Sequence, residues 1–302
     1  MALHMDETPS RRRFLGWRRA STTLAVSVCG LAIPLQEQHP TFRDRTRIVP
    51  VYVTVRDSRG QFVPDLPRED FRVFDNGHER PIEVFENKIE PIAVVVLRDD
   101  SDSLRGARAI KDVAIRSFID ALLPGDLARL AEFADKVTFS PHWSGDHSEL
   151  VAHLAALPKG GGNTALGDAV RAGLGELEGQ QGRPVLLLLS DGGAPGVSAL
   201  ATLVPERVTV YFVGIWNGAT TASRYLREAF QFASDSGGGY HLLRPTDDMA
   251  KVFREISDEL HHRYLLGFSP AVLDGKKHSI EVRTTRSGMN VRSRSSYIAV
   301  DR

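Results

Sequence analysis

The chain has 302 residues, of which 42% are hydrophobic and 25% charged; these proportions are typical of a folded globular protein and exclude a disordered chain or a polytopic membrane protein. Lysine plus arginine and aspartate plus glutamate number 38 each, so no net charge attracts the protein to nucleic acid or to an anionic membrane surface. The single cysteine, Cys29, excludes an intramolecular disulfide.

The first residues resemble an export signal. Ser10-Arg11-Arg12-Arg13-Phe14-Leu15 is similar to the twin-arginine signal, whose pattern is S/T-R-R-x-F-L. The apolar stretch 24–35 that follows is too short and too polar to span a membrane. We expect residues 1–37 to be the signal, the protein to be exported to the periplasm or the exterior, and the mature chain to have no integral membrane span. A cytoplasmic protein with a basic tail is the alternative.

Residues 38–90 are predicted to form the first part of a β-rich domain. Val49, Val51, Val53 and Val55 repeat every second residue, which indicates a strand with one buried face. The segment 71–74 leads into Asp75-Asn76-Gly77, a hairpin signal because Asn and Gly accept positive φ. We expect the returning strand to contain Ile82, Val84 and Phe85.

The pattern changes after Pro91. The run 92–97 is continuously apolar, as in a strand that helices cover on both sides. Beyond it, helical and extended patterns alternate, which predicts an α/β fold with a doubly wound, mostly parallel sheet over residues 91–262. The predicted helices are 104–123, 147–157, 165–177, 198–203, 221–232 and 247–262. The further predicted strands are 126–133, 137–143, 185–189, 208–215 and 240–243.

The β pattern returns in residues 263–302. The segments 264–268, 278–284 and 291–298 are predicted strands, separated by turns at Asp274-Gly275 and Ser287-Gly288. Three strands on each side of the α/β region are too few to form an independent sheet. We therefore expect the N- and C-terminal strands to pair into one smaller β-rich domain, into which the α/β domain is inserted.

Oxygen-bearing side chains follow several of the predicted elements. Asp99, Ser101 and Ser103 come directly after the first α/β strand, Thr164 ends the loop Gly160-Gly161-Gly162-Asn163-Thr164, and Asp191 follows the strand 185–189. The carboxyl ends of parallel strands meet at one edge of a sheet, so these groups are expected to converge. Carboxylate and hydroxyl oxygens suit a hard divalent cation such as Mg²⁺, which keeps positions for water or an outside ligand.

These residues resemble the von Willebrand factor A (VWA) family. Its metal-ion-dependent adhesion site (MIDAS) consists of Asp-x-Ser-x-Ser, a distal Thr and a distal Asp, and Asp99, Ser101, Ser103, Thr164 and Asp191 match it in order. The resemblance covers roughly residues 91–262, and the flanking β segments look like those of the exported bacterial VWFA-related proteins.

The resemblance implies a non-enzymatic, adhesion-type binding module. In such a module Mg²⁺, or alternatively Mn²⁺ or Ca²⁺, accepts a carboxylate from a partner protein, and binding is coupled to movement of the last helix, here 247–262. It also implies metal ligation by the five matching residues. The identity of the partner, the oligomeric state and the preferred cation are left open by the sequence.

Two residues depart from the family pattern. Arg98 stands where an apolar residue is usual, and Asp102 stands where Gly is common. Asp102 adds to a negative cluster with Asp99, Asp100 and Asp191, so either the cation is bound more strongly or Arg98 partly replaces it. A structural VWA protein with a decayed metal site is therefore one alternative.

The other alternative is enzymatic. Asp100 and Asp102 approximate the nucleophile loop of haloacid-dehalogenase-like phosphatases, with Ser190 as the second motif and Asp247-Asp248 as the last. No lysine occurs between Lys159 and Lys251 to hold the phosphoryl group, and the glycine-rich loop would have no role. The histidines 142, 147 and 153 show no paired spacing of a zinc site, so we expect them to be solvated.

Overall fold

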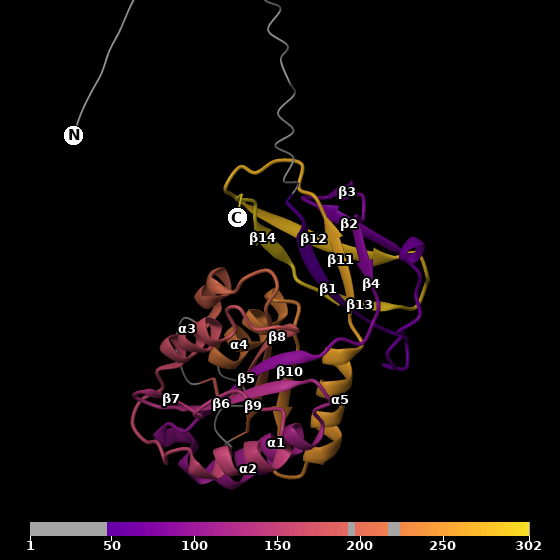
Figure 1. Cartoon of the computed structure of the whole chain (residues 1–302). Helices are drawn as coiled ribbons and strands as arrows, with labels where there is room; N and C mark the ends of the chain where they lie inside the picture. The colour runs from indigo at the N-terminus through magenta and orange to yellow at the C-terminus, as the bar shows by residue number, and fades with distance from the viewer. Residues whose placement is uncertain (1–46, 193–196, 217–223, 302) are drawn as a thin grey trace, which may run out of the picture. The chain divides into compact units, whose positions relative to one another are not determined.

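The computed structural model describes residues 47–192, 197–216 and 224–301 (Figure 1). The predicted export signal and Cys29 lie outside the described residues. Within this part of the chain, no helix combines the length and the apolar character that crossing a bilayer requires.

A six-stranded sheet forms the centre of the α/β part, in the order β10-β9-β8-β5-β6-β7. Its neighbouring strands are parallel except for β7, which runs antiparallel to β6 at the edge. The sheet confirms the predicted doubly wound, mostly parallel arrangement. Its strands are β5 (Ile92–Asp99), β6 (Leu127–Phe133), β7 (Val137–Phe139), β8 (Arg183–Ser190), β9 (Thr209–Ile215) and β10 (Tyr240–Leu243).

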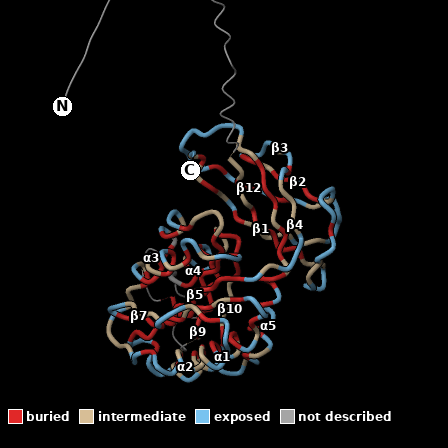
Figure 2. The backbone as a smooth tube through the Cα atoms, viewed as in Figure 1, coloured by how far each residue is buried: buried red, intermediate tan, exposed pale blue. Residues whose placement is uncertain are grey.

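Helices cover both faces of this sheet (Figure 1). Every residue of β5 is buried (Figure 2). Its side chains alternate between two cores. Val94 and Val96 join the core with α1, α2 and α5, whereas Val95 and Leu97 join the core with α3, η3 and α4. These helices are α1 (Arg108–Asp120), α2 (His147–Ala156), α3 (Leu166–Glu176), η3 (Val197–Leu203), α4 (Arg224–Asp235) and α5 (Met249–His261).

The remaining strands form two four-stranded sheets, in the orders β13-β1-β11-β4 and β14-β12-β2-β3. Strands from the two ends of the described chain pair directly: β1 with β11 and β13, and β2 with β12. One apolar core joins both sheets, so they form the expected smaller β-rich part. Its strands are β1 (Val49–Arg56), β2 (Phe71–Asp75), β3 (His78–Arg80), β4 (Val84–Glu86), β11 (Tyr264–Phe268), β12 (Lys277–Thr284), β13 (Asn290–Ser293) and β14 (Ser296–Ile298). The domain boundaries at residues 38, 91 and 263 stay predictions.

Two strand predictions were wrong. The hairpin does turn at Asn76 and Gly77, both at positive φ, but the returning strand is β3, and Val84 belongs to β4 in the other sheet. The predicted strand 291–298 is divided into β13 and β14, which lie in different sheets. Between them Arg294 is buried and donates to the carbonyl of Pro205, which accounts for the break.

Some helix predictions differ in type or extent. The predicted helix 104–123 is a 3-10 helix, η2 (Asp102–Ala107), followed by α1, and the predicted helix 198–203 is also a 3-10 helix, η3. The predicted strand 137–143 ends at Phe139. The first residues of the predicted helix 221–232 lie outside the described residues, and α4 continues to Asp235.

Arg263 links the α/β sheet to the β-rich strands. It follows α5 directly, is 3% exposed, and donates to Thr209 Oγ1 at 2.7 Å, to the Gly237 carbonyl at 2.6 Å and to the Tyr52 carbonyl at 3.3 Å. Burial lowers the pKa of Arg263 to about 10, so the guanidinium is still protonated at neutral pH. A buried charge of this kind stabilises a fold only when its hydrogen bonds are made.

Replacing Arg263 should therefore destabilise the protein. In Arg263→Met the side chain keeps its length but no longer donates to the three acceptors, and we expect a loss of roughly 3 kcal/mol in the free energy of unfolding, measured by urea denaturation. The matched control is Arg283→Met, because Arg283 is exposed and its contacts, with nearby Glu281 and over the Phe74 ring, lie at the surface. Equal midpoints for the two variants would contradict this role of Arg263.

Candidate metal centre

The carboxyl ends of β5 and β8 lie side by side. The two strands are parallel, with Arg98 opposite Leu189, so Asp99 and Ser190 reach the same edge of the sheet. Ser190 Oγ donates to Asp99 Oδ2 at 2.5 Å, and the Ser101 backbone N–H donates to Asp99 Oδ1 at 2.9 Å. These two bonds fix the orientation of the Asp99 carboxylate, which is fully buried.

The two serines of the motif follow at the start of η2. Ser101 Oγ and Ser103 Oγ lie 3.2 Å apart, and Ser101 is buried while Ser103 is exposed. The structure thus brings Asp99, Ser101 and Ser103 into one group of oxygen atoms, as predicted from their spacing. This group extends from the interior at Asp99 to the surface at Ser103.

The electrostatics of Asp99 favour a cation. Burial raises the pKa of Asp99, hydrogen bonds from Ser101 and Ser190 oppose the shift, and the charge of Asp191 adds to it. Asp191 is 1% exposed and follows β8, so two buried carboxylates lie near each other at this edge. Among the described residues, no lysine or arginine donates to the Asp99 carboxylate. A divalent ion would supply the missing positive charge, and the carboxylate and hydroxyl donors fit Mg²⁺.

The glycine-rich loop is attached to the serine loop by two hydrogen bonds, one between backbone groups and one to the Asp102 side chain. The Asp102 N–H donates to the Gly162 carbonyl at 3.1 Å, and the Gly162 N–H donates to Asp102 Oδ1 at 3.0 Å. Gly162 has φ +101°, and a Cβ there would clash with the Asp135 carboxylate, so this position requires glycine. Thr164 follows this attached loop and is half-buried. In the part of the chain that the structure describes, no contact joins its hydroxyl to Asp99, and ligation by Thr164 and Asp191 stays a prediction.

Arg98 does not contact Asp99. Its side chain is fully buried and donates to Asp112 Oδ1 at 2.8 Å, to Asp100 Oδ2 at 3.1 Å and to the Pro158 carbonyl at 3.3 Å. The alternative in which Arg98 partly replaces the ion therefore has no contact to support it. The negative cluster expected from the sequence is also smaller, because the Asp100 carboxylate belongs to this arginine network.

Asp100 holds three cationic side chains. Besides Arg98, Lys111 Nζ lies 2.8 Å from Asp100 Oδ1 and Arg108 lies 3.0 Å from Asp100 Oδ2, while Asp100 itself is 5% exposed. The second proposed phosphatase residue, Asp102, pairs with Arg105 on the surface at 2.5 Å. A phosphatase nucleophile must reach its substrate, and the buried, fully engaged Asp100 gives no support to that alternative.

Sequence reasoning missed two participants in this region. Ser190 orients Asp99, although its position at the end of an apolar strand was visible. Lys111 is fully buried and also donates to the Asp99 carbonyl, so α1 is attached to the motif. The spacing of Arg108 and Lys111, three residues apart on a predicted helix, was the available signal that both cations face the same way.

Removal of the Asp100 carboxylate should destabilise the fold strongly. In Asp100→Ala, Lys111 stays buried without a carboxylate partner and Arg98 keeps only Asp112. Breaking a buried ion pair in this way typically costs about 3–5 kcal/mol of the free energy of unfolding. The control is Asp102→Ala, whose carboxylate is exposed and paired with an exposed arginine, and for which we expect little change in global stability. Chemical denaturation of both variants tests the difference, and an Asp100→Ala protein as stable as the unsubstituted chain would refute the network.

No protein-family model and no curated protein sequence matches this chain. Similar solved structures include a von Willebrand factor type A protein from Catenulispora acidiphila, with 12% identity over 85% of this chain and 74% of that chain and a TM-score of 0.46. The ArnB paralog VWA2 from Sulfolobus acidocaldarius has 13% identity over 81% and 75%, with a TM-score of 0.45. Proximal thread matrix protein 1 from the mussel byssus, with a zinc-occupied MIDAS motif, has 17% identity over 60% and 48%, with a TM-score of 0.47.

At these identities and TM-scores, the likeness carries no argument about what this chain binds. The fold class rests on the chain's own sheet order, on the helices that cover both faces, and on the Asp-x-Ser-x-Ser motif at the end of β5. By these features the α/β part has the doubly wound, mostly parallel fold that the sequence predicted.

Proposed function

We propose that this protein is a metal-dependent, adhesion-type binding module. In this proposal Asp99, Ser101, Ser103, Thr164 and Asp191 hold a divalent cation, and a partner protein presents an acidic residue to it. The observation that carries the proposal is the oriented and buried Asp99 carboxylate, which is hydrogen-bonded to Ser101 and Ser190 and receives no cationic side chain among the described residues. The Ser101 hydroxyl in turn lies 3.2 Å from that of Ser103.

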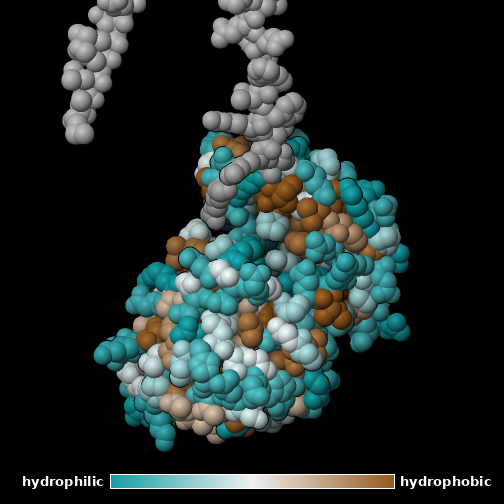
Figure 3. Space-filling view, in the orientation of Figure 1, coloured by the Kyte–Doolittle hydropathy of each residue, from teal (hydrophilic) through white to brown (hydrophobic). Residues whose placement is uncertain are grey.

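The position of the donors supports recognition of a partner at the surface. Asp99 is buried and Ser103 is exposed, so a partner would approach from the side of Ser103. On the face that Figure 3 shows, the surface over the α/β sheet is mostly hydrophilic, with scattered apolar side chains. An ion that accepts a carboxylate allows specific binding without a large apolar interface. Mg²⁺ is the cation that we favour, with Mn²⁺ or Ca²⁺ as alternatives.

We also propose export through the twin-arginine-like segment, so that the partner is met outside the cytoplasm. This part of the proposal rests on residues 10–15 alone, which lie outside the described residues. The structural alternative, a VWA-type protein whose site no longer binds metal, predicts that cations have no effect.

We expect Mg²⁺ to stabilise the protein by neutralising the buried Asp99 carboxylate. Because burial raises the pKa of Asp99, the ionised carboxylate destabilises the metal-free fold above that pKa, and Asp99→Asn should be more stable than the unsubstituted chain in EDTA at pH 7.5. Saturating Mg²⁺ should raise the melting temperature of the unsubstituted chain and leave that of Asp99→Asn unchanged.

A matched control for this experiment is Asp120→Asn, at the exposed end of α1. It should respond to Mg²⁺ as the unsubstituted chain does. If neither Mg²⁺, Mn²⁺ nor Ca²⁺ changes the melting temperature of the unsubstituted chain, the site is decayed and the proposal fails.

Partner binding should require the ion. In a pull-down from the extracytoplasmic fraction, the unsubstituted chain should retain its partners with Mg²⁺ and release them in EDTA, whereas Asp99→Asn should retain none under either condition. Asp120→Asn is again the control. Partners that Asp99→Asn retains in EDTA would bind elsewhere and would contradict this mechanism.

We further propose that binding is coupled to α5. Lys111 on α1 contacts the Asp99 carbonyl, and Phe118 of α1 packs against Phe253 of α5 with ring centroids 6.1 Å apart. The C-terminal end of α5 is held by His261, whose Nε2 lies 3.0 Å from Asp126 Oδ2, before the chain enters β11. This contiguous packing gives a physical route from the site to the β-rich part.

Hydrogen exchange tests this coupling. Amides of α5 should change their exchange rate when Mg²⁺ and a captured partner bind together, while those of α4, which packs on the other face of the sheet, should change little. If the α5 amides exchange at the same rates in the free and the bound protein, binding is not coupled to α5 and this part of the proposal is wrong.

A further inference from the structure

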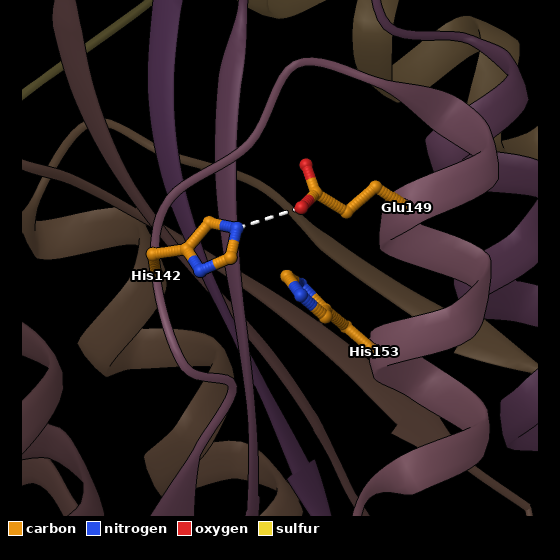
Figure 4. Close-up of side chains that lie close together, drawn as sticks. All are labelled: His142, Glu149 and His153. Carbon is orange, nitrogen blue, oxygen red and sulfur yellow. Dashed lines mark hydrogen bonds and ion pairs between the residues drawn. The ribbon is translucent and has the colours of Figure 1, made fainter.

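Three potential metal ligands meet where the connection from β7 enters α2. His142 lies in the connection that precedes α2, and Glu149 and His153 are four residues apart on α2, so their side chains share one face of the helix (Figure 4). One ligand atom from each of the three residues lies within 4.8 Å of the others.

The contacts within this group are close. His142 Nε2 lies 2.7 Å from Glu149 Oε1, and the rings of His142 and His153 are 4.9 Å apart between centroids, with an angle of 82° between their planes (Figure 4). Nδ1 of His153 is buried and has no hydrogen-bond partner in the described part of the chain. A buried polar atom without a partner is costly in a native fold, and binding of an ion is one way in which such an atom is satisfied.

The surrounding structure holds these side chains in place. Ser144 forms two backbone hydrogen bonds with Ala128 of β6, at 2.8 and 3.0 Å, which attaches the connection to the sheet. The Ser144 hydroxyl donates to Glu149 Oε2, and Asp146 caps α2 by accepting from the Glu149 N–H at 2.8 Å. The Ser144 hydrogen bond, with a smaller contribution from His142, lowers the pKa of Glu149, so its carboxylate is ionised at neutral pH.

We propose that His142, Glu149 and His153 form a site for a divalent transition metal ion, with Zn²⁺ as the best match. Two imidazoles and one carboxylate are a ligand set that binds zinc and leaves a fourth position for water or an outside ligand. A tetrahedral zinc ion holds its ligand atoms about 3.3 Å apart. That spacing falls between the 2.7 Å contact of His142 with Glu149 and the 4.8 Å limit of the group.

The sequence expectation for these histidines was incomplete. No paired spacing pointed to zinc, because the ligands come from a loop and a helix and include a glutamate. His147 is exposed at the first turn of α2 and lies outside the group. The site also differs in chemistry from the oxygen-rich group at β5, since imidazole favours zinc, copper or nickel over magnesium.

Zinc titration of the full chain tests the proposal. In the Asp99→Asn background, which lacks the buried carboxylate of the β5 site, we expect one equivalent of Zn²⁺ to bind, as measured by calorimetry and by competition with a chromophoric chelator. His142→Ala and His153→Ala should each abolish that equivalent. His147→Ala, in the same helix, should leave it intact. Co²⁺ in place of Zn²⁺ should give the intense visible bands of a tetrahedral ion, lost in the same two variants.

A positioning variant makes the test sharper. Ser144→Ala removes the hydroxyl that orients Glu149 and should weaken zinc affinity by about 10–100-fold. The proposal is overturned if the Asp99→Asn chain binds no zinc, or if His142→Ala and His153→Ala bind it as tightly as their parent. Neither result affects the magnesium response of the unsubstituted chain, so the two sites are tested independently.

Discussion

The division of charge at the end of β5 is the constraint on which the candidate site depends. Consecutive side chains of a strand point to opposite faces, so Arg98 and Asp100 face α1 while Asp99 faces the other way. On the α1 face, Arg98, Lys111 and Arg108 surround Asp100. On the opposite face, Asp99 receives hydrogen bonds from Ser101 and Ser190 but no cationic side chain among the described residues.

This division gives the two carboxylates different roles. A buried ion network is costly to assemble and costly to break, so the contacts of Asp100 fix the end of β5 and the first turns of α1 in one arrangement. Asp99 is held by the same backbone, yet its negative charge is not neutralised by a neighbouring cation. The fold thereby maintains a buried carboxylate with a raised pKa, next to two hydroxyls, at the edge where strands β5 and β8 end. Carboxylates whose pKa is shifted by their surroundings are common where proteins bind ions or partners.

Much of the fold followed from local patterns, whereas the long-range partners did not. The apolar run 92–97 and the alternation after it predicted the doubly wound sheet, and the spacing of Asp99, Ser101 and Ser103 predicted that their side chains would lie together.

The partners of Arg98 were missed because Asp112 and Pro158 lie far from it in sequence, although the two-residue period of a strand already placed Arg98 and Asp99 on opposite faces. Near Val84 and near Arg294 the chain passes from one β sheet to the other. The local sequence does not predict these changes of sheet, because β-branched and polar residues suit either sheet equally. The group of His142, Glu149 and His153 was not predicted, because His142 reaches α2 through the conformation of the loop that follows β7, which sequence spacing does not reveal.

Anomalous diffraction from crystals grown with Mn²⁺ tests the central claim most directly. The account predicts one strong peak within ordinary coordination distance of the side-chain oxygens of Asp99, Ser101 and Ser103, with Arg98 still bound to Asp100. A map with no peak at the β5 edge, or with Arg98 turned onto Asp99 in place of the ion, would contradict it.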